Sequence, residues 1–121
     1  MLILVSGMTK ADWPDVARIY QEGIDTGNAT FALHPPASWA EWRKGKIEGC
    51  SLVAREGNQV VGWAALTPYS GRAVYAGVAE VSVYVGAAAR GQGVGSALLE
   101  ALIAASEVAG IWTLQAGIFP E

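Results

Sequence analysis

The sequence predicts a single α/β domain, built on a mixed and mostly antiparallel sheet with helices packed against it. Its 121 residues suffice for one hydrophobic core but not for a two-domain enzyme. Hydrophobic residues make up 52% and charged residues 16%, a composition typical of a packed globule and unlike that of a disordered chain. Apolar patterns of strands and helices follow one another in the order β, α, α, β, β, β, α, β.

The chain is predicted to begin with a strand and a helix. The apolar run Leu2–Ser6 has strand character and ends at Gly7. Thr9 and Asp12 have the spacing of a capping box, and apolar residues then recur at helical spacing as far as Ile24. We therefore expect a helix over about Lys10–Asp25.

A loop and a short helix should follow. The segment Thr26–Ala37 is rich in Gly, Asn and Pro, which favours a loop, yet it contains Phe31, a side chain that is costly to expose. Ser38 and Glu41 repeat the capping-box spacing. They predict a short helix that Gly49 ends.

Three strands of an antiparallel meander come next. Ser51–Arg55 and Gln59–Thr67 are β-rich runs joined through Gly57-Asn58, a dipeptide suited to the positive φ values of a tight hairpin turn. A further turn at Gly71-Arg72 leads into Val74–Val85, which is rich in Val and Tyr.

The last elements are a helix and a strand. From Val94 apolar residues recur at spacings of three and four until Gly110, which predicts a helix over Val94–Ala109. Ile111–Ile118 returns to strand character. Because a helix connects it to the third meander strand, these two strands should lie parallel through a crossover.

Charge and residue counts exclude several classes of function. The net charge of −3 argues against a protein that binds nucleic acid or anionic membranes. The chain has one cysteine, Cys50, and one histidine, His34, which excludes an internal disulfide and gives no support for a metal site. No leader or membrane-spanning pattern is found. We therefore expect a cytoplasmic location, a small-molecule partner and no metal.

The stretch with chemical information joins the strand Val81–Val85 to the helix that starts at Val94. The loop between them reads Arg90-Gly91-Gln92-Gly93, and the helix opens with Val94-Gly95-Ser96. Alternate glycines let backbone N–H groups point into one concavity, and a helix N-terminus adds unsatisfied donors and partial positive charge. This pattern predicts a site for an anion such as pyrophosphate, although glycines that merely allow close packing are an alternative. Neither the Walker A nor the dinucleotide fingerprint matches.

The pattern Arg90-x-x-Gly93-x-Gly95 resembles the acetyl-CoA pyrophosphate loop of the GCN5-related N-acetyltransferase (GNAT) superfamily. The resemblance extends over nearly the whole chain. Segments that resemble the phosphinothricin and methionine sulfone acetyltransferase branch are Ala29-Thr30-Phe31, Gly62-Trp63-Ala64, Arg72 with Tyr75, Glu80–Val85 and Leu114–Glu121. The resemblance implies the GNAT fold, acetyl-CoA as co-substrate and a homodimer.

Two features depart from the family pattern. Ala32 stands where the family usually has an acid after the Ala-Thr-Phe triplet. The family also continues well past the Phe-Pro-Glu sequence at residues 119–121. We therefore expect residues 1–121 to be a C-terminally incomplete acetyltransferase domain, without the last strands, a further helix and a candidate general acid. An uncovered edge at the last strand also favours pairing between chains.

The resemblance assigns roles to particular residues. An amine must lose its proton before it attacks a thioester, and Glu80 is the candidate base. It is the only acid in a strongly apolar strand, so we expect burial to raise its pKa, with a solvated strand Glu as the alternative. The cofactor is expected along Val83, Tyr84 and Val85 and in the loop Arg90, Gly91, Gln92, Gly93, Val94, Gly95 and Ser96. The substrate is expected at Phe31, Ser70, Gly71, Arg72 and Tyr75.

Together these features predict an N-acetyltransferase that acetylates the primary amine of a small amino-acid-like substrate. Candidates are phosphinothricin, methionine sulfone and methionine sulfoximine. Cys50 has no basic neighbour that would lower its pKa, so direct transfer in a ternary complex is favoured over a covalent intermediate. The alternative is an acetyl-CoA-binding module without turnover, or a fragment of a longer acetyltransferase. The five tryptophans are interpreted as core residues.

Overall fold

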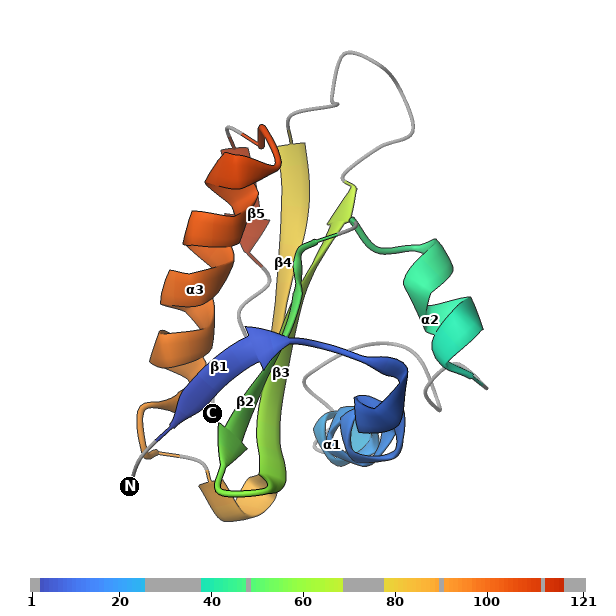
Figure 1. The fold of residues 1–121 in the computed structure, drawn as a ribbon, viewed down its shortest axis with the longest axis vertical. Coiled ribbons are helices and arrows are strands. Elements are labelled where there is room, and N and C mark those ends of the chain that lie inside the picture. The colour runs from blue at the N-terminus through green and yellow to red at the C-terminus, as the bar shows by residue number, and fades with distance from the viewer. Residues whose placement is uncertain are drawn as a thin grey trace.

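The computed structural model describes residues 3–25, 38–47, 49–68, 78–89, 91–111 and 113–116. They form a five-stranded sheet in the order β1-β2-β3-β4-β5. The first four strands are antiparallel and β5 runs parallel to β4, as the crossover predicted (Figure 1). The strands are β1 (Leu4–Gly7), β2 (Ser51–Glu56), β3 (Gln59–Pro68), β4 (Val78–Val85) and β5 (Thr113–Ala116).

Three α-helices and two short 3-10 turns are described between the strands. They are η1 (Lys10–Asp12), α1 (Trp13–Asp25), α2 (Trp39–Lys44), η3 (Ala87–Ala89) and α3 (Val94–Val108). The capping box at Thr9 and Asp12 is present, and the predicted α/β fold and element order are confirmed. None of the described helices is both long and apolar enough to span a bilayer.

Three local predictions need correction. The helix expected to run to Gly49 ends at Lys44, because the Ile47 N–H leaves the helical pattern and donates to the Leu66 carbonyl of β3 at 2.8 Å. In the hairpin turn only Gly57 has a positive φ, +61°, so Asn58 does not adopt the left-handed conformation. β1 begins at Leu4 and includes Gly7, whereas the prediction began at Leu2 and ended at Ser6.

The sheet separates two layers of hydrophobic core. Because strand side chains alternate, Val81, Val83 and Val85 of β4 pack on the α3 face, whereas Tyr84 lies on the face covered by α1. Figure 1 shows α3 on one side of the strands and α1 and α2 on the other. Trp42 and Trp63 are buried in the second layer, as expected of core tryptophans.

A partly buried ion pair links η1, just before α1, to the sheet. Asp12 accepts a 2.6 Å hydrogen bond from Arg55 of β2 and a 2.9 Å bond from the Thr9 backbone N–H. Burial by itself would raise the pKa of Asp12, but these hydrogen bonds and the positive charge of Arg55 outweigh it and hold the pKa below its usual value.

Candidate active site

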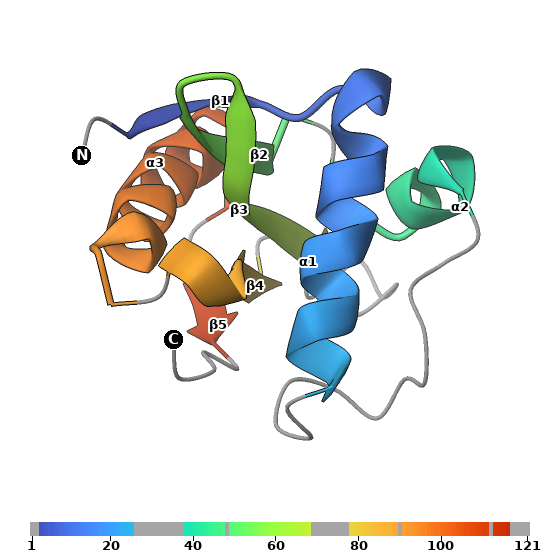
Figure 2. The same cartoon turned by 90° about the horizontal axis from the view of Figure 1, so that it is seen from below.

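The predicted cofactor loop lies where the chain leaves β4 and enters α3. The Gly86 N–H donates to the Val61 carbonyl at 2.8 Å, which ends the pairing of β4 with β3. The chain then forms η3 and turns into α3. Figure 2, viewed from below, shows η3 and the first turn of α3 at the same end of the sheet.

Two glycines give this loop its shape. Gly91 and Gly93 have φ values of +79° and +81°, a region in which a side chain is strained. Both are exposed, and a Cβ added to either would meet no atom within 4 Å. The loop backbone is therefore open to solvent at both glycines.

The first turn of α3 adds hydrogen-bond donors beside the loop at Gly91 and Gly93. Gly93 is the N-cap, and its carbonyl accepts the first helical bond from the Ala97 N–H at 3.1 Å. The N–H groups of Val94, Gly95 and Ser96 therefore have no acceptor within the helix. The first turn carries no acidic residue that would compete for them. This geometry suits a diphosphate, and the binding role of these residues remains a prediction.

The position of α3 depends on a glycine in β3. A Cβ at Gly62 would lie 3.0 Å from the Tyr84 carbonyl oxygen, 3.0 Å from Val94 Cγ1 and 3.1 Å from Leu98 Cδ1. Contacts of this length are tighter than nine in ten real Cβ contacts, so the neighbouring atoms would have to move by a few tenths of an ångström. The absence of a side chain at residue 62 thus lets the first turn of α3 approach the sheet closely. The sequence showed Gly62 only as part of a family resemblance.

Gly62→Ala should therefore lower stability and weaken binding at the α3 N-terminus together. We expect a loss of about 1–3 kcal/mol in the free energy of unfolding, the usual cost of overpacking. Gly7→Ala is the matched control, because Gly7 is also a strand glycine but has open space at its Cβ position. Denaturant unfolding measures both variants. Equal stability of the two would show that the close approach is not required.

Sequence reasoning missed a side chain that holds the turn after β4. Glu22 of α1 accepts a 3.0 Å hydrogen bond from the Ala87 backbone N–H, at the start of η3. Its second oxygen accepts a 3.2 Å bond from Arg18. The spacing of Arg18 and Glu22 predicts a pair on one helix face, but nothing local indicates which loop the carboxylate reaches. Glu22 therefore ties α1 to the turn that precedes the predicted cofactor loop.

The structure corrects the expected environment of Glu80. Its backbone lies in the middle of the sheet, in register with Thr67 of β3 and Gln115 of β5. Its side chain is exposed, so the burial expected from its apolar neighbours is wrong. The reason is alternation along β4: Glu80 shares a face with Tyr84, but Tyr84 is covered by Tyr20 of α1 at 5.1 Å between ring centroids, whereas the described helices leave Glu80 open.

The strand residues expected along the cofactor have buried side chains. Val83 and Val85 belong to the core beneath α3. The Tyr84 ring stacks on Trp63 with centroids 4.6 Å apart, and burial together with the neighbouring Tyr20 raises the pKa of Tyr84 to about 12. Any contact that these three residues make with a cofactor must therefore come from their backbone.

Cys50 is unsuited to nucleophilic chemistry. The side chain is fully buried, its Sγ lies 3.7 Å from the Ala105 carbonyl oxygen, and burial raises the pKa of the thiol. A neutral buried thiol is a poor nucleophile.

Six of the predicted site residues lie outside the described residues. They are Phe31, Ser70, Gly71, Arg72, Tyr75 and Arg90.

Comparison with known proteins identifies the family to which the chain is similar. The acetyltransferase (GNAT) family model matches residues 13–119. A Bacillus subtilis (strain 168) protein with the provisional name phosphinothricin acetyltransferase YwnH is 37% identical over 112 residues, which cover 89% of this chain and 69% of that protein. The phosphinothricin N-acetyltransferase of Alcaligenes faecalis is 37% identical over 100 residues, which cover 79% of this chain and 51% of that protein. The chain thus spans about half the length of the second relative.

A solved structure extends the likeness to three dimensions. A GNAT superfamily phosphinothricin acetyltransferase (Pat) from Sinorhizobium meliloti, in complex with acetyl-CoA, is similar with a TM-score of 0.83 and 32% sequence identity. The match covers 96% of this chain and 65% of that one. With the family match over most of its length, and with the strand, glycine loop and helix in the predicted arrangement, the chain belongs to the GNAT acetyltransferase family.

Proposed function

We propose that the protein transfers the acetyl group of acetyl-CoA to the primary amine of a small amino-acid-like substrate. The observation that carries the proposal is the α3 N-terminus, where two glycines of positive φ precede three N–H groups that lack a helical acceptor. This arrangement suits the pyrophosphate of acetyl-CoA. Arg90 precedes it in the sequence and supplies the charge expected at the start of such a loop.

Residues of this chain can be assigned to the steps of the acyl transfer. The neutral amine nitrogen forms a bond to the acetyl carbon while the carbon–sulfur bond breaks, and the departing thiolate of coenzyme A takes up the second proton that the nitrogen loses. Glu80 accepts the proton that the ammonium form of the substrate must lose. Its exposure lets an amine reach the carboxylate. A backbone N–H near Val85 polarises the acetyl carbonyl as negative charge develops on its oxygen.

Direct attack in a ternary complex is favoured over an acetylated enzyme. A covalent route would need an accessible thiolate, and Cys50 is buried with a raised pKa. In the direct route both substrates are bound before any bond changes.

The substrate class rests on the relatives and on the resemblance. Two relatives at 37% identity are named phosphinothricin acetyltransferases. We propose that phosphinothricin, methionine sulfone or methionine sulfoximine is accepted, with Phe31, Ser70, Gly71, Arg72 and Tyr75 around it. A homodimer and a cytoplasmic location are proposed on the resemblance and the sequence pattern alone, and sedimentation at micromolar concentration measures the first of these.

Release of the coenzyme A thiol tests the proposal. We expect thiol release with acetyl-CoA plus phosphinothricin, methionine sulfone or methionine sulfoximine, above the rate without amine and above that with a panel of unrelated amines. The competing function is an acetyl-CoA-binding module without turnover. Calorimetry that detects submillimolar acetyl-CoA binding, without thiol release for any amine, would favour the module and overturn the enzymatic proposal.

A further inference from the structure

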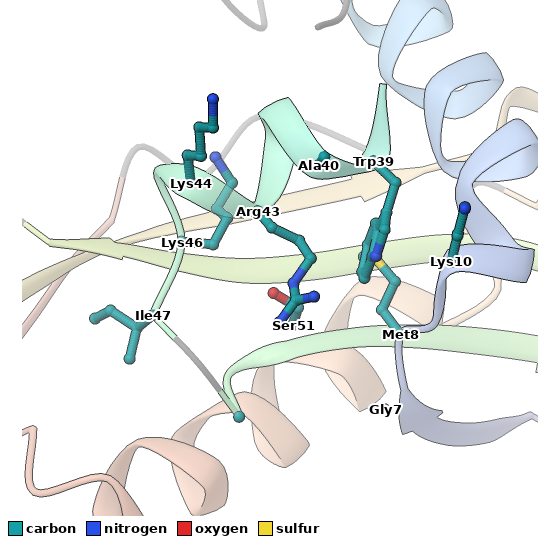
Figure 3. A pocket seen from close by; sticks show the side chains of 11 residues that line it. Gly7, Met8, Lys10, Trp39, Ala40, Arg43, Lys44, Lys46, Ile47 and Ser51 are labelled. Atoms are coloured by element: carbon teal, nitrogen blue, oxygen red, sulfur yellow. The ribbon is translucent and has the colours of Figure 1, made fainter. Parts of the chain in front are cut away.

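A pocket of about 720 Å³ lies away from the cofactor loop, between α2, the chain that follows it and the adjoining ends of β1 and β2. The strand order places β1 and β2 at the opposite edge of the sheet from β5, the parallel neighbour of β4. The pocket is lined by Lys10, Arg43, Lys44 and Lys46, half of the eight Lys and Arg residues of the chain, and by Trp39 and Ser51 (Figure 3).

The described lining of this pocket is strongly basic. Among the described residues that line it there are four cations and no carboxylate. The ion pairs found within the described part of the chain engage Arg18 and Arg55, and none of the four lining cations. The chain as a whole carries a net charge of −3, so the cluster does not follow from a generally basic surface. The fold creates it by bringing Lys10, from η1, beside three cations that follow one another in residues 43–46.

Aromatic rings hold two of these cations in place without neutralising them. Arg43 Cζ lies 5.7 Å from the centroid of the Trp39 ring, and Lys46 Nζ lies 4.9 Å from that of Trp42. The two rings are stacked, with centroids 5.6 Å apart and planes 13° from parallel. Burial also lowers the pKa of Lys46, since its ammonium has lost part of its hydration. A guanidinium placed beside a ring and a partly dehydrated ammonium favour an anionic ligand.

We propose that this pocket binds a small organic anion with two or more phosphate or carboxylate groups, at a site separate from the acetyl-CoA loop. Its volume lies in the usual range for small-molecule sites, about 300–1,000 Å³. The planar guanidinium of Arg43 can bind a phosphate or carboxylate through two hydrogen bonds, while the lysines act as point charges. Figure 3 shows Arg43 extending from α2 toward Ser51, which adds a hydroxyl donor, with the Trp39 ring beside it.

Titration with inorganic pyrophosphate and with citrate, followed by calorimetry, tests the proposal and separates phosphate from carboxylate chemistry. Excess coenzyme A is present so that the loop at α3 is occupied. Arg43→Gln should weaken binding of the preferred probe at least tenfold. Arg43→Lys is the matched control, because it keeps a cation at the same exposed helix position, and it should weaken binding less than Arg43→Gln does.

The indole N–H signals in a ¹⁵N spectrum locate the bound probe even if coenzyme A does not bind. The Trp39 signal should shift during the titration and that of buried Trp63 should not. Three results would overturn the proposal: neither probe binds at millimolar concentration, Arg43→Gln binds as tightly as the unchanged chain, or coenzyme A displaces the probe. Thermal melts of both variants confirm that the fold is retained.

Discussion

Gly93→Asp should abolish acetyl-CoA binding and leave the fold intact. The side chain would stand at the N-cap of α3, in the open space where we place the pyrophosphate. A carboxylate about 4 Å from one phosphate costs about 4 kcal/mol near a protein surface. Since about 1.4 kcal/mol corresponds to a factor of ten, calorimetry should show an affinity loss of 100-fold or more. The melting temperature should fall by no more than a few degrees, because a side chain at a φ of +81° is strained but Asp visits positive φ more readily than most residues.

Two further variants separate the effect of the added charge on acetyl-CoA binding from the effect of backbone strain. Gly93→Asn adds a side chain of the same shape without charge, and should weaken binding much less than Gly93→Asp. Gly110→Asp places the same charge at the other end of α3, at a φ of +80° and with no atom within 4 Å of its Cβ position. It should leave acetyl-CoA affinity unchanged. If Gly93→Asp binds acetyl-CoA normally, the pyrophosphate does not lie at this helix.

The cofactor loop could be predicted from sequence because its signals are local. Gly91 and Gly93 stand at positions that need a positive φ, and the helical spacing after Val94 locates the start of α3 within one residue. The parallel pairing of β5 with β4 was also predictable, because a strand, a helix and a strand in succession form a crossover. The loop depends on neighbours in sequence, whereas the strand pairing follows from a general rule for a strand, a helix and a strand in succession.

The features that could not be predicted from the sequence depend on contacts between segments that are distant in the sequence. The exposure of the Glu80 side chain depends on how far α1 extends along the sheet. The apolar neighbours of Glu80 in β4 do not indicate where α1 ends. Gly62 matters because α3, more than 30 residues later in the sequence, packs against it. The basic pocket likewise forms only when Lys10 is brought to α2. Tertiary packing determines the exposure of Glu80, the role of Gly62 and the formation of the basic pocket.

Glu80→Gln should reduce turnover strongly at neutral pH and spare cofactor binding. An aliphatic amine with a pKa near 10 is almost entirely protonated at pH 7, so transfer requires a group that takes the proton. Loss of a general base usually costs about 10²–10⁴-fold in rate. We expect a loss of this size in kcat/KM for the amine at pH 7, measured by thiol release. The KM for acetyl-CoA should not change, because Glu80 lies on the face of β4 opposite to α3.

The pH profile distinguishes a base from a residue with a structural role. At higher pH a growing fraction of the amine is already neutral, so the deficit of Glu80→Gln relative to the unchanged enzyme should shrink as the pH rises toward 10. Glu56→Gln is the matched control, since Glu56 is an exposed strand glutamate at the end of β2, and it should follow the unchanged enzyme at every pH. A deficit in Glu80→Gln that is constant with pH, or smaller than threefold at pH 7, would assign proton removal to another group. Because the Glu80 side chain is exposed on its strand, the substitution should not perturb packing, and loss of activity can be attributed to the missing carboxylate.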